Sequence, residues 1–403
     1  MTESRPHILV FSSLFPSPAR PGAGLFIRER MFRVAEHLPL TVVSPQPWFP
    51  LQGLIRRFRP HFRPLPSVDR EVQQGIPVHY PRFFSVPGLF KSWDGDFMAW
   101  GCRRLLERIQ NASGFDVIDA HFAYPDGYAA VRLGRRFQVP VTITLRGTEV
   151  PLSRDPARRE KILQALDGAD RVFAVSESLK RHVVALGADG DKITVVGNGV
   201  DVNRFHPIPR DEARGALGIP EKSRVLITVG ALVPRKGQQR VLEVLPRLLS
   251  RFPDLLYLMV GGASPEGDQT EALQRQVADL GLEEHVRFLG PVAPDELRVP
   301  LSAADVFVLA TANEGWANVF LEAMACGLPV VTTDVGGNRE VVCREELGIV
   351  VPYGDAGALR QALTTALEKE WDRDRIVAYA RENGWERRVA VLVEAFQRLL
   401  EGR

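Results

Sequence analysis

Residues 313–333 read NEGWANVFLEAMACGLPVVTT and show the repeating unit from which the chain is built. They follow one apolar run, 305–310, and they end in another, 329–333. Between these runs lie a polar, glycine-containing loop and a short helical pattern, 319–326. The order predicts a strand, a loop, a helix and a second strand, as in a parallel α/β sheet.

The ends of the predicted helix carry boundary signals. Asn318 stands where an N-cap is expected, Gly327 takes the usual position just past a helix, and Pro329 prevents continuation. The loop therefore lies at a strand's carboxyl end beside a helix N-terminus, where α/β proteins bind anions. Glu314 and Glu322 flank this helix start. We expect a site for a ligand that carries both phosphates and hydroxyls.

The composition is ordinary for a globular protein. The chain has 403 residues, 45% of them apolar and 25% charged, which is enough for two domains. A net charge of +2 does not indicate a nucleic-acid partner. Cys102, Cys326 and Cys343 show neither metal-ligand nor disulfide spacing, which favours a reducing compartment. With no apolar run near the roughly 20 residues of a membrane span, we expect a cytoplasmic protein.

Alternating strand and helix patterns continue through both halves of the chain. The expected strands of the first half are 7–12, 40–44, 117–120, 141–145, 171–175 and 193–196. Those of the second half are 225–229, 255–260, 286–289, 306–310, 330–333 and 348–351. Helical patterns between most of them predict two α/β domains of Rossmann type that face each other across a cleft.

The domain boundary is expected in a proline-rich and charged segment, 201–223, interpreted as a linker with one short helix, 210–217. The predicted domains are therefore 1–201 and 202–380. A last amphipathic helix, within 381–403, packs at a place that its pattern does not indicate.

Residues 45–100 are less regular and contain a basic, aromatic-rich patch. Its sequence, WFPLQGLIRRFRPHFRPLP, places Arg56, Arg57, Arg59 and Arg63 among large apolar side chains. Such a patch can rest on an anionic membrane surface. The alternative is a surface loop whose apolar side chains pack against the domain, and the prolines argue against a long amphipathic helix.

The second half also presents cations before a helix. The strand 225–229 runs into GALVPRKGQQ, so Arg235 and Lys236 stand just before a predicted helix N-terminus. A solvated turn would look the same, but this loop and the loop of Glu314 lie on one edge of one sheet. Cations would hold phosphates, and carboxylates would accept hydrogen bonds from vicinal hydroxyls. A nucleotide-diphosphate sugar meets these requirements together, without a metal-binding pair of aspartates.

The sequence resembles the family 4 glycosyltransferases, retaining enzymes with the two-domain GT-B fold. The segment EGWANVFLEAMACGLPVVTTDVGG is similar to the family's Glu-x7-Glu signature. Supporting segments are VGALVPRKG, VRFLGPV, AADVFVLAT and NGVDVNRFHP, with PGAGLFIRER, DAHFAYPDG and VTITLRGTEV in the first half. The resemblance covers nearly the whole chain, and its strength lies in the order and spacing of these segments.

The resemblance implies a role for each matching residue. Glu314 would contact the transferred sugar, while Arg235 and Lys236 would hold the departing diphosphate. Many relatives carry an arginine at the position of Ala231, and we expect Arg235 to supply that charge. His121, which from its position alone would be a structural histidine, would lie near the sugar and acceptor. The remaining donor-side positions would contact phosphates, base and ribose: Gly24, Leu289, Val292, Asn318, Val319 and Glu322.

These observations predict a metal-independent, retaining glycosyltransferase without a cofactor. Its donor would be a UDP- or GDP-sugar and its acceptor a glycan or lipid-linked hydroxyl, in polysaccharide or glycolipid assembly. Two alternatives stay open. One is a sugar-nucleotide epimerase or hydrolase on the same fold, and the other is a non-catalytic subunit that binds nucleotide sugars.

Overall fold

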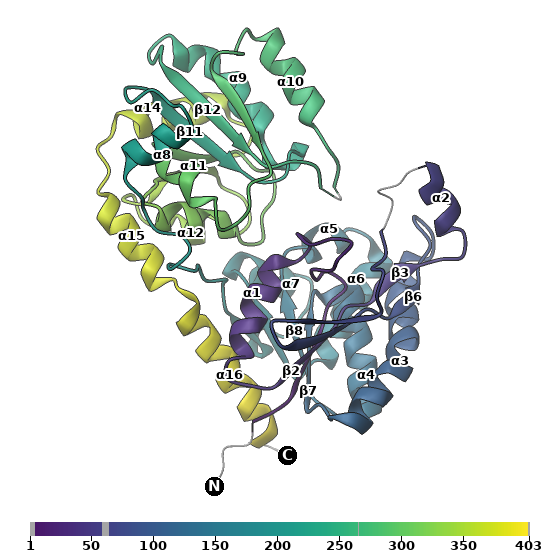
Figure 1. Cartoon of the computed structure of the whole chain (residues 1–403). Coiled ribbons are helices and arrows are strands. Elements are labelled where there is room, and N and C mark those ends of the chain that lie inside the picture. The colour runs from purple at the N-terminus through teal and green to yellow at the C-terminus, as the bar shows by residue number, and fades with distance from the viewer. Residues whose placement is uncertain (1–4, 59–63, 265, 402–403) are drawn as a thin grey trace. The chain divides into compact units, whose positions relative to one another are not determined.

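The computed structural model describes residues 5–58, 64–264 and 266–401. The chain divides into two compact units (Figure 1). Unit 1 comprises residues 1–198 and 386–403, and unit 2 comprises residues 199–385. The division falls three residues before the expected position at 201, and the C-terminal segment belongs to unit 1.

Unit 1 is built on an eight-stranded sheet in the order β10-β9-β8-β7-β1-β2-β5-β4. The ladders are parallel except for the hairpin of β4 and β5 at one edge. The strands are β1 (Ile8–Phe11), β2 (Leu40–Val43), β4 (Arg70–Gln73), β5 (Ile76–His79), β7 (Val117–His121), β8 (Val141–Leu145), β9 (Arg171–Ala174) and β10 (Ile193–Val195). A separate two-stranded sheet pairs β3 (Gln46–Trp48) with β6 (Arg82–Phe84).

The helices of unit 1 join these strands by crossovers, as parallel pairing requires. They are α1 (Leu25–Val34), α2 (Gln52–Phe58), α3 (Asp94–Ala112), α4 (Tyr128–Phe137), α5 (Glu149–Leu152), α6 (Pro156–Gly168), α7 (Glu177–Ala185) and α16 (Trp385–Glu401). The last helix, yellow in Figure 1, packs on unit 1, where the ring of Phe396 meets that of Phe173 edge to face. Residues 45–100, expected to be less regular, thus contain four short strands, α2 and the start of α3 in their described part.

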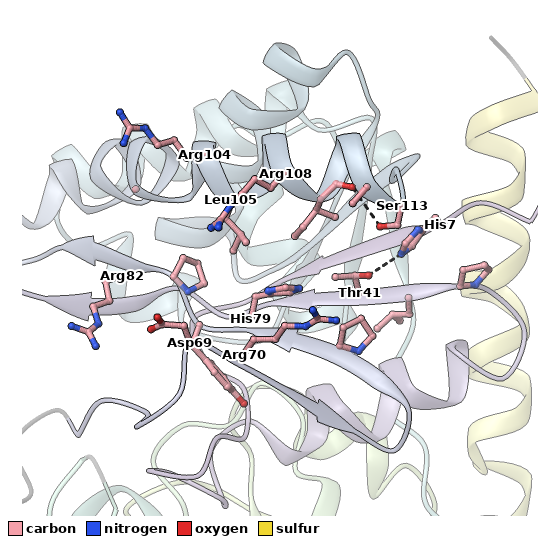
Figure 2. A pocket seen from close by; sticks show the side chains of 18 residues that line it. His7, Thr41, Asp69, Arg70, His79, Arg82, Arg104, Leu105, Arg108 and Ser113 are labelled. Atoms are coloured by element: carbon pink, nitrogen blue, oxygen red, sulfur yellow. Dashed lines mark hydrogen bonds between the residues drawn. The ribbon is translucent and has the colours of Figure 1, made fainter.

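A large groove lies between α3 and the β2–β5 edge of unit 1 (Figure 2). Its volume is about 1100 Å³. One end is formed by His7 and Thr41, whose side chains are hydrogen bonded at 2.9 Å. The other end contains Arg82, on β6. The groove therefore runs between α3 and the strands β2, β5 and β4 at one side of the sheet.

Unit 2 has a six-stranded, fully parallel sheet in the order β13-β12-β11-β14-β15-β16. The strands are β11 (Arg224–Val229), β12 (Leu255–Val260), β13 (Val286–Gly290), β14 (Val306–Leu309), β15 (Val330–Thr333) and β16 (Gly348–Val351). The helices are α8 (Arg210–Ala216), α9 (Gln238–Leu249), α10 (Thr270–Asp279), α11 (Arg298–Ala303), α12 (Asn318–Ala325), α13 (Asn338–Val341), α14 (Ala356–Glu368) and α15 (Arg373–Glu382).

Alternate side chains of each strand of unit 2 point to opposite faces of the sheet, which gives two apolar cores. On β11, Val225 and Ile227 belong to the core covered by α11, α12 and α15. Leu226, between them, belongs to the core covered by α9, α10 and α14. Burial on both faces explains why these strands read as continuous apolar runs.

The interpretation of residues 201–223 as a linker was wrong. Phe205, Ala213 and Ile219 are buried in the core of unit 2 beside β11. The guanidinium of Arg214 is also buried, and it forms an ion pair with Asp305, 3.1 Å away at the start of β14. The prolines and charges that suggested a linker belong to a segment that closes one side of the unit.

Candidate active site

The candidate site of unit 2 lies where the strand order reverses. β11 is followed along the chain by β12 on one side, whereas β14 adds to its other side. The loops that leave the carboxyl ends of β11 and β14 meet at this reversal, which is the position where open α/β sheets bind ligands. These two loops carry Arg235 and Lys236 on one side and Glu314 on the other.

The loop after β11 is held in place by a glycine. A single 3₁₀ turn, Pro234–Lys236, ends at Gly237, which has a φ of 81° and precedes α9. A Cβ atom there would lie 2.0 Å from the carbonyl oxygen of Ala310, so no larger residue fits. This close approach fixes Arg235 and Lys236 between the end of β14 and the N-terminus of α9.

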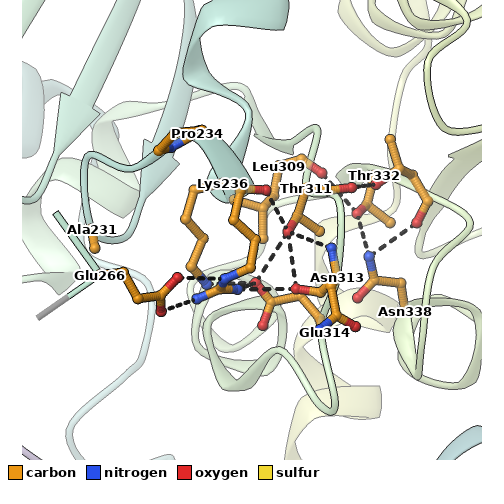
Figure 3. A network of polar contacts seen from close by, with 12 residues as sticks. Ala231, Pro234, Lys236, Glu266, Leu309, Thr311, Asn313, Glu314, Thr332 and Asn338 are labelled. Carbon is orange, nitrogen blue, oxygen red and sulfur yellow. Dashed lines mark hydrogen bonds and ion pairs between the residues drawn. The ribbon is translucent and has the colours of Figure 1, made fainter. Parts of the chain in front are cut away.

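The two cations meet on one carboxylate oxygen (Figure 3). Oε1 of Glu314 lies 2.6 Å from Nζ of Lys236 and 3.0 Å from Nη1 of Arg235. The side chains of Glu314, Lys236 and Arg235 are 10%, 16% and 30% exposed. The cluster is thus partly removed from water. Its charges therefore interact more strongly than they would at an open surface.

A second carboxylate completes the surroundings of Arg235. Glu266 accepts two parallel hydrogen bonds from it, at 2.8 Å from Nε and 2.7 Å from Nη2. This bidentate pairing, with the charge of Glu314, raises the pKa of Arg235, and hydrogen bonding to Arg235 lowers the pKa of Glu266. Both residues are therefore charged at neutral pH.

Neighbouring loops position the backbone of Glu314. The buried hydroxyl of Thr311 lies 3.0 Å from the carbonyl oxygen of Arg235 and 3.3 Å from Oε1 of Glu314. The Gly336–Gly337 turn after β15 supports the other side. A Cβ at Gly336 would lie 1.6 Å from the carbonyl oxygen of Glu314, and the amide of Gly337 donates to that oxygen at 3.3 Å. Glu314 is thus held through its carboxylate by residues of the loops after β11 and β14, and through its backbone by the loop after β15.

The structure corrects one detail of the helix that follows. Asn318 is the first residue of α12, and the N-cap position belongs to Ala317, which has no side-chain oxygen. Gly327 has a φ of 81° just past the helix, as expected. Val319 and Glu322 are half-buried on this helix.

The last two positions predicted on the donor side, Leu289 and Val292, flank the end of β13. Both are half-buried and pack on the core that α12 also covers. β12 separates β13 from β11 in the sheet. Leu289 and Val292 therefore lie along the same carboxyl edge as the cation–carboxylate cluster, two strands away from it.

The predicted histidine lies in unit 1, at that unit's own reversal of strand order between β1 and β7. His121 is fully buried, and burial together with nearby Arg146 lowers its pKa well below the usual value. Nε of Arg146 donates to its Nδ1 at 3.2 Å, which places the proton of the neutral ring on Nε2, 3.4 Å from Asp119. The following Phe122 has a φ of 76°, a conformation that is strained for an aromatic residue.

Gly24 has a structural reason to be glycine. It precedes α1 with a φ of 67°, and a Cβ there would lie 2.3 Å from the carbonyl oxygen of Leu14. This contact accounts for the glycine whether or not its loop meets a ligand.

Several polar residues at these sites escaped prediction. Glu266, Thr311, Asp119 and Arg146 are ordinary polar residues in sequence, and each has a partner that lies 23 to 76 positions away. The only sequence signal was that Thr311 and Arg146 directly follow predicted strands, whereas Asp119 lies within one and Glu266 lies in a loop. Among the described residues, no group of three or more His, Cys, Asp or Glu side chains is arranged to hold a metal ion.

Comparison with known proteins identifies the class. Residues 209–383 match the family model for glycosyl transferases group 1, and residues 51–204 match that for glycosyltransferase family 4. The fold matches a crystal structure of Anabaena HepE in complex with UDP, with a TM-score of 0.73 at 20% identity over 99% of this chain and 100% of that one. Two Rossmann-like units with these matches define a glycosyltransferase of the GT-B fold.

Individual relatives place the chain within that class. It is 30% identical over 365 residues to a Bacillus subtilis (strain 168) protein assigned as a glycosyltransferase of teichuronic acid biosynthesis, covering 89% of this chain and 88% of the relative. It is 32% identical over 348 residues to a D-inositol 3-phosphate glycosyltransferase of Geodermatophilus obscurus, covering 81% and 76%. The chain belongs to the family 4 glycosyltransferases, as its motifs predicted.

The basic patch of residues 48–66 is described only in part, because Arg59 and Arg63 lie outside the described residues. Arg56 and Arg57 are on α2. Phe49 is buried, whereas Leu51 and Leu54 are 64% and 59% exposed. Some apolar side chains of the patch thus pack inward and others face solvent. None of the described helices is long and apolar enough to cross a membrane.

Proposed function

We propose that this glycosyltransferase takes its sugar from a nucleotide-diphosphate sugar and transfers it to a hydroxyl acceptor with retention of configuration. The observation that carries the proposal is the pairing of Lys236 and Arg235 with one oxygen of Glu314 at the reversal of strand order. The proposed donor is a UDP- or GDP-sugar. HepE, which shares this fold, has been solved both with UDP and with UDP-glucose, which supports a nucleotide sugar and favours the UDP form.

In this proposal unit 2 binds the donor. The diphosphate replaces Glu314 as the partner of Lys236 and Arg235, at the N-terminus of α9. Backbone amides at Asn318 and Val319 assist from the start of α12. Glu322 accepts hydrogen bonds from the ribose, and the backbone between Leu289 and Val292 faces the base.

Once the diphosphate has taken its cations, Glu314 is available to the sugar. A carboxylate only accepts hydrogen bonds, so it orients sugar hydroxyls and stabilises the positive charge that develops at the anomeric carbon. The bond from this carbon to the diphosphate oxygen breaks as the bond to the acceptor oxygen forms on the same face. The acceptor's proton passes to the departing phosphate, and Lys236 and Arg235 stabilise the charge left on the diphosphate. No metal ion takes part in this scheme.

Unit 1 supplies the acceptor side, as the prediction for residues 1–201 stated. Gly24 brings its loop near the phosphates, and His121 lies close to the sugar and acceptor. Because the ring of His121 is neutral and hydrogen bonded to Arg146, it contributes as a fixed, uncharged group rather than as a cation. The acceptor is a glycan or lipid-linked hydroxyl in polysaccharide or glycolipid assembly.

A peripheral contact with anionic membrane completes the proposal. The exposed side chains of Leu51 and Leu54 lie on or beside the helix that carries Arg56 and Arg57, so an apolar and a basic group are presented together. Sedimentation with vesicles of anionic phospholipid tests this contact. Replacing Arg56 and Arg57 by glutamate should abolish co-sedimentation, and equal binding by both proteins would remove the membrane contact from the proposal.

The donor is identified by thermal shift with a panel of UDP- and GDP-sugars, because a bound donor stabilises the fold by mass action. The stabilising donor is then incubated with a panel of glycan acceptors and the anomeric configuration of the product is read by NMR. An acceptor-dependent product with the donor's configuration supports the proposal. Free sugar or an epimer formed without acceptor would indicate the rival hydrolase or epimerase, and donor binding without turnover would indicate a binding subunit.

A further inference from the structure

The groove of unit 1 between α3 and the β2–β5 edge is not used by the proposed reaction. Its His7 end lies at the amino ends of β1 and β2, since His7 precedes Ile8, which pairs with Leu40. His121, in contrast, ends β7 at the carboxyl edge of the sheet. The groove is therefore a second concave surface of the same unit, with its own lining.

The charge of this lining is strongly one-sided. Arg70, Arg82, Arg104 and Arg108 line the groove, and Asp69 is its only acidic residue among the described lining residues. All four arginines are exposed, and none of them makes an ion pair within the described part of the chain. Figure 2 shows Arg108 on the α3 wall and Arg70 on the opposite strand wall, with His79 between them.

Arginines on the neighbouring helix α4 form ion pairs, unlike those of the groove. Arg132 and Arg136 lie one turn apart on α4, as Arg104 and Arg108 do on α3. Arg132 pairs with Asp96 at 3.3 Å, and Arg136 pairs with Glu107 at 2.8 Å. The arginines of the groove thus present guanidinium groups that an external anion can bind in bidentate fashion.

We propose that this groove binds an acidic oligosaccharide, a chain of sugar units that carry carboxylate groups. A volume of about 1100 Å³ is much larger than a single small anion needs, and the arginines are spread over α3, β4 and β6. The lining also includes Pro39, Pro77 and Pro81, whose apolar surfaces match the C–H faces of sugar rings. The hydroxyl of exposed Ser113 supplies a polar contact at the other end.

The lining does not suit a nucleic acid. Single strands bind to basic grooves by stacking their bases on aromatic side chains. Among the described lining residues, Tyr80 is the only tyrosine, phenylalanine or tryptophan. It is buried, and its hydroxyl is hydrogen bonded to Glu71 at 2.6 Å and to the carbonyl oxygen of Pro16 at 2.9 Å. No tyrosine, phenylalanine or tryptophan ring of the described lining is therefore available for stacking.

The inference rests on the proposed function in one respect, because the bound glycan is taken to be a distant part of the acceptor or product chain. Its test does not depend on transfer. A fluorescently labelled hexamer of galacturonic acid is titrated with the full-length protein, without donor, and binding is followed by anisotropy. Neutral maltohexaose with the same label and inorganic tripolyphosphate as competitor separate sugar recognition from charge alone.

The decisive comparison uses two double variants. Arg104→Ala with Arg108→Ala removes two groove cations, and Arg132→Ala with Arg136→Ala removes two cations at the same spacing from α4. We expect the first to weaken galacturonate binding at least tenfold and the second less than twofold, with circular dichroism showing both folded. Equal losses in both variants, binding of maltohexaose as tight as galacturonate, displacement by tripolyphosphate at equal concentration, or no binding of the hexamer by the wild type would each overturn the inference.

Failure of this inference can be told from failure of the proposed function. Galacturonate binding with the expected variant pattern, but no sugar transfer to any acceptor, leaves the groove assignment standing and overturns the reaction. Transfer from a nucleotide sugar to a short acceptor, without galacturonate binding, does the opposite.

Discussion

The ammonium nitrogen of Lys236 lies 2.6 Å from Oε1 of Glu314, although the two residues are 78 positions apart. The contact joins the loops that follow β11 and β14. It joins the carboxylate that we propose for the sugar to a cation that we propose for the phosphates. Because Arg235 contacts the same oxygen at 3.0 Å, the carboxylate keeps one cation if the other leaves.

Replacing Lys236 by alanine should reduce transfer about 100- to 1000-fold, the usual effect of removing one group that stabilises transition-state charge. The fold should persist, because Arg235 still neutralises Glu314. Initial rates at saturating donor, with a melting curve for each protein, measure both effects. Lys222→Ala, an exposed lysine before β11, is the matched control and should retain full activity. Normal turnover by the Lys236 variant would refute the phosphate role.

Replacing Glu314 by glutamine should separate donor binding from transfer. The variant frees Lys236 and Arg235 from a competing anion, so the affinity for UDP should rise by a few-fold. Transfer should nevertheless fall by at least 100-fold, because a neutral amide stabilises positive charge at the anomeric carbon poorly. Calorimetric titration measures the affinity for UDP, and initial rates measure transfer. Loss of UDP affinity together with unchanged transfer would assign Glu314 to the phosphates instead of the sugar.

Replacing Arg214 by methionine should destabilise unit 2 by about 3 kcal/mol, because the buried, negatively charged carboxylate of Asp305 then loses one of its cationic partners. Nη2 of Arg214 lies 3.1 Å from Asp305, which also accepts a hydrogen bond from the amide of Val225 at 2.8 Å. Arg210 and Arg373 also approach Asp305 and limit the loss.

Urea unfolding measures this change, and replacing exposed Arg247 on α9 by methionine controls for the loss of a surface arginine. Adding Asp305→Asn to the Arg214 variant should recover part of the stability, since the buried charge is then gone. A double variant that loses the sum of both single effects would show that the two side chains do not act as a pair.

Arg214 also shows what sequence patterns leave out. β12, Leu255–Val260, was predicted to the residue because a strand buried on both faces is a continuous apolar run. The placement of the Lys236 and Glu314 loops on one edge was also predictable, because loops after parallel strands share one edge of the sheet, but their direct ion pair was not predicted. Arg214, in contrast, lies in a segment too short and too polar for periodicity to indicate burial, and its partner is 91 positions away.

The same limit applies to the site. Glu266 reaches Arg235 from the loop after β12, and nothing in its neighbouring residues distinguishes it from other surface glutamates. Asn318 was misplaced by one position because a side chain suited to capping precedes an apolar run, whereas the backbone begins its helical turn at Asn318 itself. Side-chain pairing and exact helix starts depend on tertiary contacts that a local pattern does not contain.

Replacing Asp126 by asparagine should flatten the pH dependence of stability. Asp126 is buried in unit 1, where it accepts hydrogen bonds from the amide and hydroxyl of Ser13, and burial raises its pKa to about 7. The folded protein therefore keeps a proton that the unfolded chain releases above about pH 4. Stability from this group is full at low pH and falls by up to about 1.4 kcal/mol per unit as the pH rises to 7.

The measurement is urea unfolding at pH 5 and pH 8 for the wild type, Asp126→Asn and, as control, exposed Asp167→Asn. Between these pH values the Asp126 variant should gain about 2–3 kcal/mol relative to the wild type, and the control should follow the wild type. The lowered pKa of His121 acts in the opposite sense, because it reduces stability below about pH 6.5. This effect is common to all three proteins, so it cancels when their free energies of unfolding are compared. Parallel curves for the wild type and the Asp126 variant would mean that Asp126 is ionised in the folded protein and that the hydrogen bonds from Ser13 outweigh the effect of burial.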